Sequence, residues 1–492
     1  MRKILTIIIS MLISSCLFAQ KNKDDNPFRF EVNIGSNSTE SSPCHAINCN
    51  EYGVAVCYII STASSGQDSL AFVLKLLDVN LEPFKESSFM LPADFYIQAY
   101  SKHNNDIYIV LSATTRKNST NIMTVKFNLE SGMAETLTMS YENIVYINEV
   151  SATNNVAYIS FSDKKNRGHL LSMNFTNKQS SFIYTSNDNI SYNILSLTNF
   201  PKENHLYLSI TQKTEQTNKL SLYELNGGSS KLRFEKNFGD SIYLTYAAPI
   251  RNINGKINTI IGAYYSGNMK NVFSANGYGY SASGIYSLNI NSSKMDLYPY
   301  RQIDKDVYFT WHAPIKFNDI DSLSTSYIFT TEAYSPRYKT TPHTDYDFYG
   351  RPYTRYYQEF VGYITIQASN YIFDDQGKLL WIANTDIENA LTLTQPHRKV
   401  VVDVIDDEIL NAYFAIDHIG YKFLDKQNRS EAQEKFYPAK KHNKDIIERE
   451  YDSKIEHWYD NNYLVYGYQS IKNNSISRNS RRTVFYVQKV SL

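Results

Sequence analysis

Histidine, tryptophan and tyrosine recur beside small residues and proline at five points along this 492-residue chain. The segments are Cys44-His45-Ala46, Tyr246-Ala-Ala-Pro249, Trp311-His-Ala-Pro314, Gln395-Pro-His397 and Glu456-His-Trp458. Imidazole can hold or transfer a proton near neutral pH, and the rings of Trp and Tyr can stack on a sugar or an aromatic ligand. A ligand site built from these segments would contain His45, Tyr246, Trp311, His312, His397, His457 and Trp458. The competing interpretation is structural, with Pro at strand edges that need no hydrogen-bond donor and the rings filling the interior.

Tyrosine and arginine gather in a second candidate region, an insert at residues 334–358. Tyr is abundant throughout, with 41 copies, but here it alternates with Arg, Pro and Gly, which predicts a long surface loop. Tyr and Arg are enriched at the centres of protein interfaces. The sequence thus favours an interaction loop over a disordered decoration, with the candidate residues Tyr338, Tyr346, Tyr349, Arg351, Tyr353, Arg355 and Tyr356.

Standard catalytic motifs are absent from the sequence, which has no GxSxG elbow, no HExxH pair, no P-loop and no repeated Asp-box. We therefore predict no catalytic residue, no metal site and no cofactor. Lys plus Arg and Asp plus Glu both number 49, and this balance argues against a nucleic-acid partner.

The first residues are typical of an export signal. Met1-Arg2-Lys3 precedes an apolar run and then small residues, a pattern that predicts a signal peptide over residues 1–19. Cleavage after Ala19 would release a soluble protein, whereas lipidation of Cys16 would anchor it to a membrane. Either route leads to the periplasm or the outer-membrane surface. No later run reaches about eighteen apolar residues, so we expect no transmembrane segment after the signal.

Three cysteines follow the signal. Cys57 lies in a strand-like apolar run with Val54 and Val56, so we expect it in the core. Cys44 and Cys49 are close in the sequence and could form a disulfide across a bend, as is common in exported proteins.

A strand-only unit recurs along the chain, and each copy has a short β-type run after a turn rich in Asn, Asp or Glu. The runs lie at residues 53–57, 106–110, 156–160, 205–209, 257–261, 326–330, 408–412 and 463–467. Repeats of this kind, with about 50 residues per unit, are typical of β-propellers, whose blades bury both faces by stacking on one another. We predict an all-β chain whose residues 27–492 form one eight-bladed propeller of four-stranded antiparallel blades, with seven blades as the alternative.

The two ends of the chain predict how the ring closes. Residues 482–492 read as only the third strand of the last blade, and residues 28–34 can supply the fourth. Such closure leaves no bare sheet edge between the first and last blades. The charged stretch 429–454 has few apolar residues, and we expect it to be a solvated excursion.

Two segments carry resemblances to known propellers. Residues 371–381, with a Gly in the turn and a Trp shortly after it, resemble the hairpin of quinoprotein-type propeller repeats. In the same hairpin Gly377 can accept a positive φ, and Trp381 offers a large apolar surface to a neighbouring blade. The Tyr-rich insert and the ending at 458–469 resemble a group of exported propellers of Bacteroidota. These resemblances imply fold and location, but no activity or cofactor.

The function that these observations favour is an exported, non-catalytic binding or scaffolding module of a bacterial cell envelope. Its partner would be an envelope protein or a glycan, and the chain would act as a monomer or as a subunit of a larger complex. The inner strands of a propeller line its central channel, and the five segments that carry His, Trp and Tyr read as inner strands, so we expect their ligand site at the channel mouth. The alternative function is a carbohydrate-active lyase or hydrolase that uses this channel mouth, with His312, His397 and His457 as acid or base candidates.

Overall fold

The structure is a computed structural model. It describes residues 28–34, 44–64, 67–91, 94–115, 118–153, 155–201, 204–213, 218–238, 242–252, 254–266, 282–300, 308–311, 315–318, 325–392, 398–405, 408–415, 418–424, 434–436, 445–473 and 480–492. Among these residues, no helix is long and apolar enough to cross a membrane. The predicted signal peptide and Cys16 lie outside the described residues.

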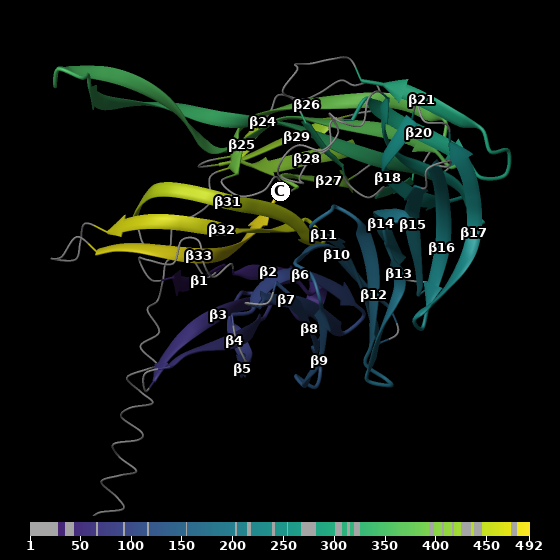
Figure 1. The fold of residues 1–492 in the computed structure, drawn as a ribbon, viewed down its shortest axis with the longest axis horizontal. Helices are drawn as coiled ribbons and strands as arrows, with labels where there is room; N and C mark the ends of the chain where they lie inside the picture. Colours follow the sequence, from purple (N-terminus) through teal and green to yellow (C-terminus); the bar gives the residue numbers. More distant parts are fainter. Residues whose placement is uncertain are drawn as a thin grey trace, which may run out of the picture.

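Eight antiparallel sheets, the blades, follow one another around a ring (Figure 1). Blades 1 to 4 contain β2 (His45–Asn48), β3 (Val54–Ser64), β4 (Gln67–Leu77) and β5 (Pro83–Leu91); β6 (Tyr96–His103), β7 (Asp106–Thr114), β8 (Thr120–Asn128) and β9 (Ala134–Tyr141); β10 (Val145–Thr153), β11 (Val156–Asp163), β12 (Gly168–Asn174) and β13 (Gln179–Thr185); β14 (Ser191–Phe200), β15 (His205–Lys213), β16 (Asn218–Asn226) and β17 (Ser229–Phe238). A short 3-10 helix, η1 (Asn50–Tyr52), joins β2 to β3.

Blades 5 to 8 complete the ring. They contain β18 (Ile242–Arg251), β19 (Ile257–Ser266), β20 (Gly284–Asn289) and β21 (Met295–Pro299); β22 (Tyr308–Trp311), β23 (Ile315–Asn318), β24 (Thr325–Tyr346), β25 (Pro352–Asp374) and β26 (Leu379–Thr392); β27 (Val400–Ile405), β28 (Glu408–Phe414), β29 (Ile419–Leu424) and β30 (Glu434–Phe436); β31 (Asp445–Tyr459), β32 (Asn462–Asn473), β33 (Ser480–Ser491) and β1 (Arg29–Ile34). In blade 6 the inner strand is in two pieces, β22 and β23, which both pair with β24. The all-β, eight-bladed prediction is confirmed.

Burial along each blade explains the sequence pattern. The second strand β11 is almost entirely buried, because neighbouring blades cover both of its faces. The fourth strand β9, at the rim, alternates exposed and half-buried side chains. The hairpin between the first and second strands places Asn104, Asn155, Asn204 or Asp460 at a positive φ between 47° and 65°. Asn and Asp tolerate this left-handed conformation, which is why the repeat is marked by these residues.

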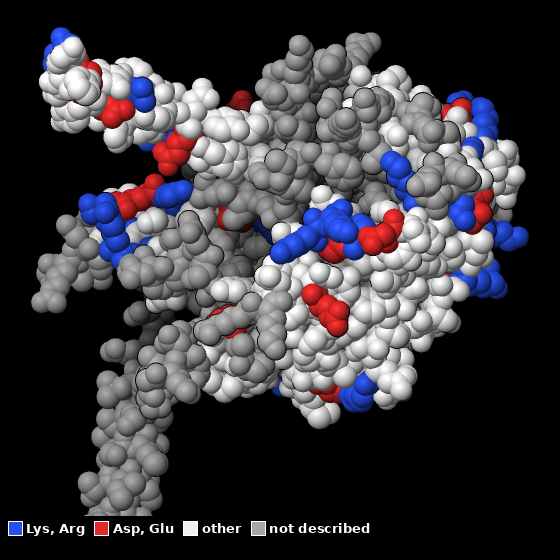
Figure 2. Space-filling view, viewed as in Figure 1, with Lys and Arg blue, Asp and Glu red and all other residues white. Residues whose placement is uncertain are grey.

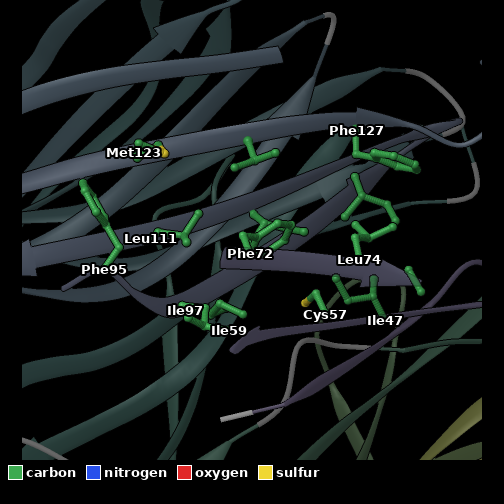
Figure 3. Close-up of a cluster of buried hydrophobic side chains, with 14 of the residues drawn as sticks. Ile47, Cys57, Ile59, Phe72, Leu74, Phe95, Ile97, Leu111, Met123 and Phe127 are labelled. Carbon is green, nitrogen blue, oxygen red and sulfur yellow. The ribbon is translucent and has the colours of Figure 1, made fainter. Parts of the chain in front are cut away.

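Eight apolar clusters hold the ring together, one between each pair of neighbouring blades. The cluster between blades 1 and 2 joins Ile47 and Phe72 to Ile97, Met123 and Phe127 (Figure 3). The cluster between blades 6 and 7 includes Trp381, as expected from the hairpin that carries it. Because every blade contacts the next one in this way, the core of the protein is a closed ring of interfaces.

The last of these interfaces depends on the N-terminal strand. β1 pairs antiparallel with β33, from Arg29 opposite Gln488 to Ile34 opposite Thr483, so blade 8 is closed by both ends of the chain. Phe30, Val32 and Ile34 pack against the cluster between blades 8 and 1. The predicted closure is confirmed.

Polar side chains fix β1 in blade 8. The buried guanidinium of Arg29 donates to Gln469 Oε1 at 2.6 Å and lies 4.4 Å from the ring centroid of Tyr486. Glu450 accepts hydrogen bonds from Tyr486 and from Gln469 Nε2 at 3.0 Å. The closing strand is therefore held by a polar network as well as by apolar packing.

Two predictions about inserted segments are wrong. The Tyr/Arg-rich insert at 334–358 is not a loop, because β24 and β25 continue through it as a regular two-stranded ribbon. Within the stretch 429–454 the described residues 434–436 and 445–454 belong to β30 and β31 rather than to a solvated excursion, and residues 429–433 and 437–444 lie outside the described residues. Asp445 and Glu450 are buried there, and Asp445 pairs with Arg482 at 2.7 Å. Partners that are distant in the sequence therefore compensate the charges of this strand.

The predicted disulfide is also corrected. Cys44, Cys49 and Cys57 are free, buried thiols. Cys44 packs between blades 8 and 1, whereas Cys49 and Cys57 pack between blades 1 and 2, so Cys44 and Cys49 face opposite sides of their blade. Cys57 is in the core, as expected.

Candidate ligand and partner sites

Bulges in the inner strands reposition polar side chains. The inner strands of blades 3, 4 and 5 each shift register by one residue, immediately before Glu149, Ser196 and Tyr246 respectively. A bulge of this kind redirects the side chain that follows it. Glu149 Oε2 accepts from the Leu197 N–H of blade 4 at 3.0 Å, and Ser196 donates to the Ala247 carbonyl of blade 5. The bulged residues therefore link each inner strand to the next one.

Arg398 is positioned beside these strands by a buried carboxylate. Glu332 of blade 6 accepts from the backbone N–H groups of Lys399 and Val400, at 3.0 and 2.9 Å. These bonds fix the start of β27, and Arg398 Nε donates to the Val400 carbonyl at 2.9 Å. The Arg398 side chain keeps access to solvent, although burial still acts on its guanidinium.

Polar residues from several blades interact electrostatically with the Arg398 guanidinium; they are Glu332, Glu456, Tyr466 and Tyr246. Burial lowers the pKa of Arg398, and these four partners act in the opposite direction. Tyr466 donates a hydrogen bond to Glu456, and the ring of Tyr100 lies 5.9 Å from that of His45, edge to face. We call this group the axial cluster; its members are His45, Tyr100, Glu149, Tyr246, Arg398, Lys454, Glu456 and Tyr466.

Burial controls protonation in the axial cluster. It raises the pKa of Glu149 to about 7, against the opposing effect of the Leu197 N–H, so this carboxyl changes charge near neutral pH. It lowers the pKa of His45 to about 3, and Lys454 acts in the same direction, which keeps this imidazole neutral. The pKa of Tyr246 is raised, first by burial and then by Glu149. Chemically, the cluster offers one cation with solvent access, neutral hydroxyls and a carboxyl that titrates near pH 7.

Only part of the predicted channel-mouth site belongs to this cluster. His45 and Tyr246 do. Trp458 does not, because it is buried between blades 8 and 1 and its Nε1 donates to the Asn50 carbonyl at 2.9 Å. His457 lies at the hairpin end of β31, where its Nε2 is 2.8 Å from the Asp460 carbonyl and its ring contacts Tyr463. The side chain of Trp311, and all of His312 and His397, lie outside the described part of the chain.

Sequence reasoning missed most of the axial residues. Tyr100, Glu149, Arg398 and Lys454 stand in no motif, and the one available signal is a polar residue at a matching place in successive inner strands. Glu149, Ser196 and Tyr246 follow that pattern. A bulge changes the side-chain parity of a strand, so strict alternation could not place them.

The second site is the ribbon that β24 and β25 form beyond blade 6. β22 pairs with β24 only as far as Tyr334, and β26 pairs with β25 only from Tyr363 onwards. Among the described residues, 337–346 and 352–362 thus pair only with each other, and with the turn at 347–351 they form what we call the arm. The arm stands clear of the ring in the ribbon and space-filling views (Figure 1, Figure 2). At its tip Asp347 accepts from the Tyr349 and Arg351 N–H groups at 2.9 Å, and Gly350 takes a φ of 74°.

The two faces of the arm differ in charge. From Tyr338 opposite Phe360 to Tyr346 opposite Pro352 the register is regular, so alternate residues share a face. The uncharged face consists of Tyr338, Thr340, Pro342, Thr344, Tyr346, Pro352, Thr354, Tyr356, Gln358 and Phe360. The charged face consists of Lys339, Thr341, His343, Asp345, Tyr353, Arg355, Tyr357 and Glu359.

The predicted interaction residues divide between these two faces and the tip. Tyr338, Tyr346 and Tyr356 lie on the uncharged face, and Tyr353 and Arg355 lie on the charged face. Tyr349 and Arg351 lie in the turn, with the Arg351 guanidinium 5.2 Å from the Tyr349 ring centroid.

The charged face has contacts of its own. Arg355 lies 3.6 Å from Asp345 and 5.4 Å from the Tyr353 ring centroid, and His343 packs edge to face on Tyr357. All ten residues of the uncharged face are exposed. One face of the arm is therefore charged and the other is not, and no described residue covers the uncharged face.

Comparisons with known proteins place the chain by fold only. No protein-family model and no curated protein matches the sequence. Among solved structures it is similar to the WD40 domain of SCAP from fission yeast, at 9% identity and a TM-score of 0.40, covering 94% of this chain and 98% of that one. It is also similar to the β-propeller domain of the Trilobed protease from Pyrococcus furiosus, at 10% identity and a TM-score of 0.36, covering 79% and 97%. A protein from Lactobacillus plantarum is similar at 11% identity and a TM-score of 0.35, covering 78% and 96%.

Proposed function

We propose that this chain is an exported, non-catalytic binding or scaffolding module of a bacterial cell envelope, and that the arm is its binding surface. The observation that carries this proposal is the arm, a ribbon that leaves its blade, pairs with no other described strand and exposes Tyr and Phe rings. Isolated two-stranded ribbons are only marginally stable in water. An exposed apolar surface of this kind is typical of a partner-binding site.

The export signal and the closed ring support the same proposal. A signal over residues 1–19 would deliver the protein to the envelope. A ring in which all eight interfaces are packed gives the arm a rigid base on blade 6. The carbohydrate-active alternative loses one stacking platform, because Trp458 is buried against blade 1.

The experiment is an armless variant in which residues 338–361 are replaced by an Asn-Gly turn that joins Arg337 to Gly362, which pair with each other. Wild type should retain a specific envelope component from its native membrane extract, and the armless variant should lose it while keeping the same melting behaviour. Equal retention by both proteins would refute the arm as the binding surface. In a parallel screen on glycans, peptides and esters, turnover that disappears in Glu149→Gln would refute the non-catalytic part.

A further inference from the structure

The uncharged face of the arm has the properties of an interface with itself. It carries no Lys, Arg, Asp, Glu or His along ten positions, whereas every charged residue of the paired segments 338–346 and 352–360 lies on the opposite face. Two copies of an uncharged face can meet without like-charge repulsion. Interface centres are likewise depleted of charged residues and enriched in aromatic ones.

Within the part of the chain that the structure describes, the exposed rings on this face make only two edge-to-face contacts, both of which involve Phe360. Tyr338 packs on Phe360 with centroids 5.7 Å apart, and Phe360 also touches Tyr363. Tyr346 and Tyr356 are 65% and 71% exposed, and no described ring packs on either. Their rings are free to stack on rings from another molecule.

The area is sufficient for a dimer. Tyr338 and Phe360 are 54% and 45% exposed. At about 150–250 Å² per ring, the four aromatic residues leave about 350–600 Å² exposed on each copy. Two copies would bury about 700–1,200 Å² from these rings alone, and a specific interface needs about 1,200–2,000 Å² in total. The six other exposed residues of the face supply the remainder.

The edges of the arm disfavour the competing mode, in which a partner adds a strand. Pro342 in β24 and Pro352 in β25 have no N–H to donate. Proline is tolerated in a ribbon where its nitrogen faces the free edge, so these residues interrupt the donors that an added strand would need. A partner can still pack against the flat, uncharged face of the ribbon, because this contact needs no backbone donors at the edge.

From these observations we infer that the occupant of the uncharged face is a second copy of this chain. Two arms pack face to face about a two-fold axis, with Tyr346 and Tyr356 of each copy against the rings of the other. The arm projects far enough from the ring for two arms to overlap while the propellers remain apart (Figure 1). This inference rests on the proposed function, because it names the partner of the surface proposed there.

The test is the oligomeric state of the purified protein, measured by sedimentation velocity over about a hundredfold range of concentration. Wild type should be a dimer that dissociates on dilution. Tyr346→Ser combined with Tyr356→Ser should weaken dimerisation by about tenfold or more. The matched control, Tyr353→Ser combined with Tyr357→Ser, changes the same residue type on the charged face and should remain dimeric. A wild type that is monomeric at every concentration, or equal weakening by both variants, overturns the inference.

Cysteine cross-linking gives a second measurement that does not depend on removing rings. In a chain that starts at Gln20 and so lacks Cys16, the remaining thiols of Cys44, Cys49 and Cys57 are buried, so an added surface cysteine reacts alone. Thr344→Cys, in the middle of the uncharged face, should give disulfide-linked dimers on mild oxidation, and His343→Cys should not. Equal cross-linking at the two positions would contradict the geometry.

Failure of this inference can be told apart from failure of the proposed function. A monomeric protein whose retention of an envelope component still depends on the arm would overturn the dimer and leave the proposed function in place. A protein that forms the arm-dependent dimer, but retains the same envelope component with or without the arm, would leave the dimer in place and overturn the proposed function.

Discussion

Removal of β1 should open the ring, and the structure allows the loss to be estimated. A chain that starts after Gly35 lacks Phe30, Val32 and Ile34, which pack half-buried against the cluster between blades 8 and 1. Complete burial of such a side chain is worth about 1.5–3 kcal/mol, so three half-buried ones contribute about 2–4.5 kcal/mol. The backbone hydrogen bonds between β1 and β33 also stabilise the fold, but the conformational entropy that β1 loses on ordering offsets them to a similar extent. The expected loss therefore comes from the apolar side chains alone. Since folded domains have a total stability of about 5–15 kcal/mol, the loss is a large fraction of it.

The assay is urea unfolding followed by circular dichroism, with light scattering to detect association of the bare β33 edge. A chain that starts at Gln20 is the control and should melt as a monomer in one cooperative step. The shorter chain should unfold at lower urea, and a peptide of residues 27–36 added in excess should recover part of the difference. Equal midpoints for the two chains would refute the role assigned to β1.

Three further predictions concern protonation, turns and export. Burial raises the pKa of Glu450 from 4.5 to about 7, so between these values the folded protein keeps a proton that the unfolded chain has released, and this carboxyl loses about 3 kcal/mol of stability as the pH rises through that window. The stability of Glu450→Gln relative to wild type, from urea titrations, should therefore improve by about that amount between pH 5 and pH 8, and an unchanged difference would contradict this. Gly377 and Gly350 have φ values of 81° and 74°, but a Cβ on Gly377 would meet Thr259 Cγ2 at 2.4 Å, whereas one on Gly350 would meet nothing within 4 Å. Gly377→Ala should thus destabilise the ring by about 2–4 kcal/mol and Gly350→Ala by about 1 kcal/mol. Equal destabilisation of the two variants, measured by calorimetry, would show that the clash with Thr259 of blade 5 does not contribute. The mature N-terminus should be Gln20, so Cys16→Ala should not change the mass of the exported protein, and incorporation of labelled fatty acid into wild type would show lipidation instead.

The sequence predicted those parts of the fold that repeat. Strand β11 begins at Val156, where the recurring run at 156–160 predicted a strand, and β1 pairs where the truncated last blade required it. The start of β31 was predicted to be solvated because it contains Asp445 and Glu450. In the structure Arg482 pairs with Asp445, and Tyr486 and Gln469 donate hydrogen bonds to Glu450. A single sequence does not reveal such distant partners.

The arm was misread for a different reason. Both of its faces are exposed, so β24 and β25 lack the alternation of apolar and polar residues that marks a half-buried strand. Charge alternates there instead, with Lys339, His343 and Asp345 on one side and Tyr338, Pro342 and Tyr346 on the other. A search for alternating charge would have found the ribbon and its uncharged face.

The most direct test of the arm as the binding surface is photo-crosslinking in intact cells. A photoreactive amino acid replaces Tyr346, which is 65% exposed on the uncharged face, or Leu232, which is 48% exposed on β17 of blade 4. The account predicts a discrete cross-linked product from position 346, at twice the mass of the chain where the partner is a second copy, and none from position 232. Absence of a product at position 346, or the same product from both positions, would contradict it.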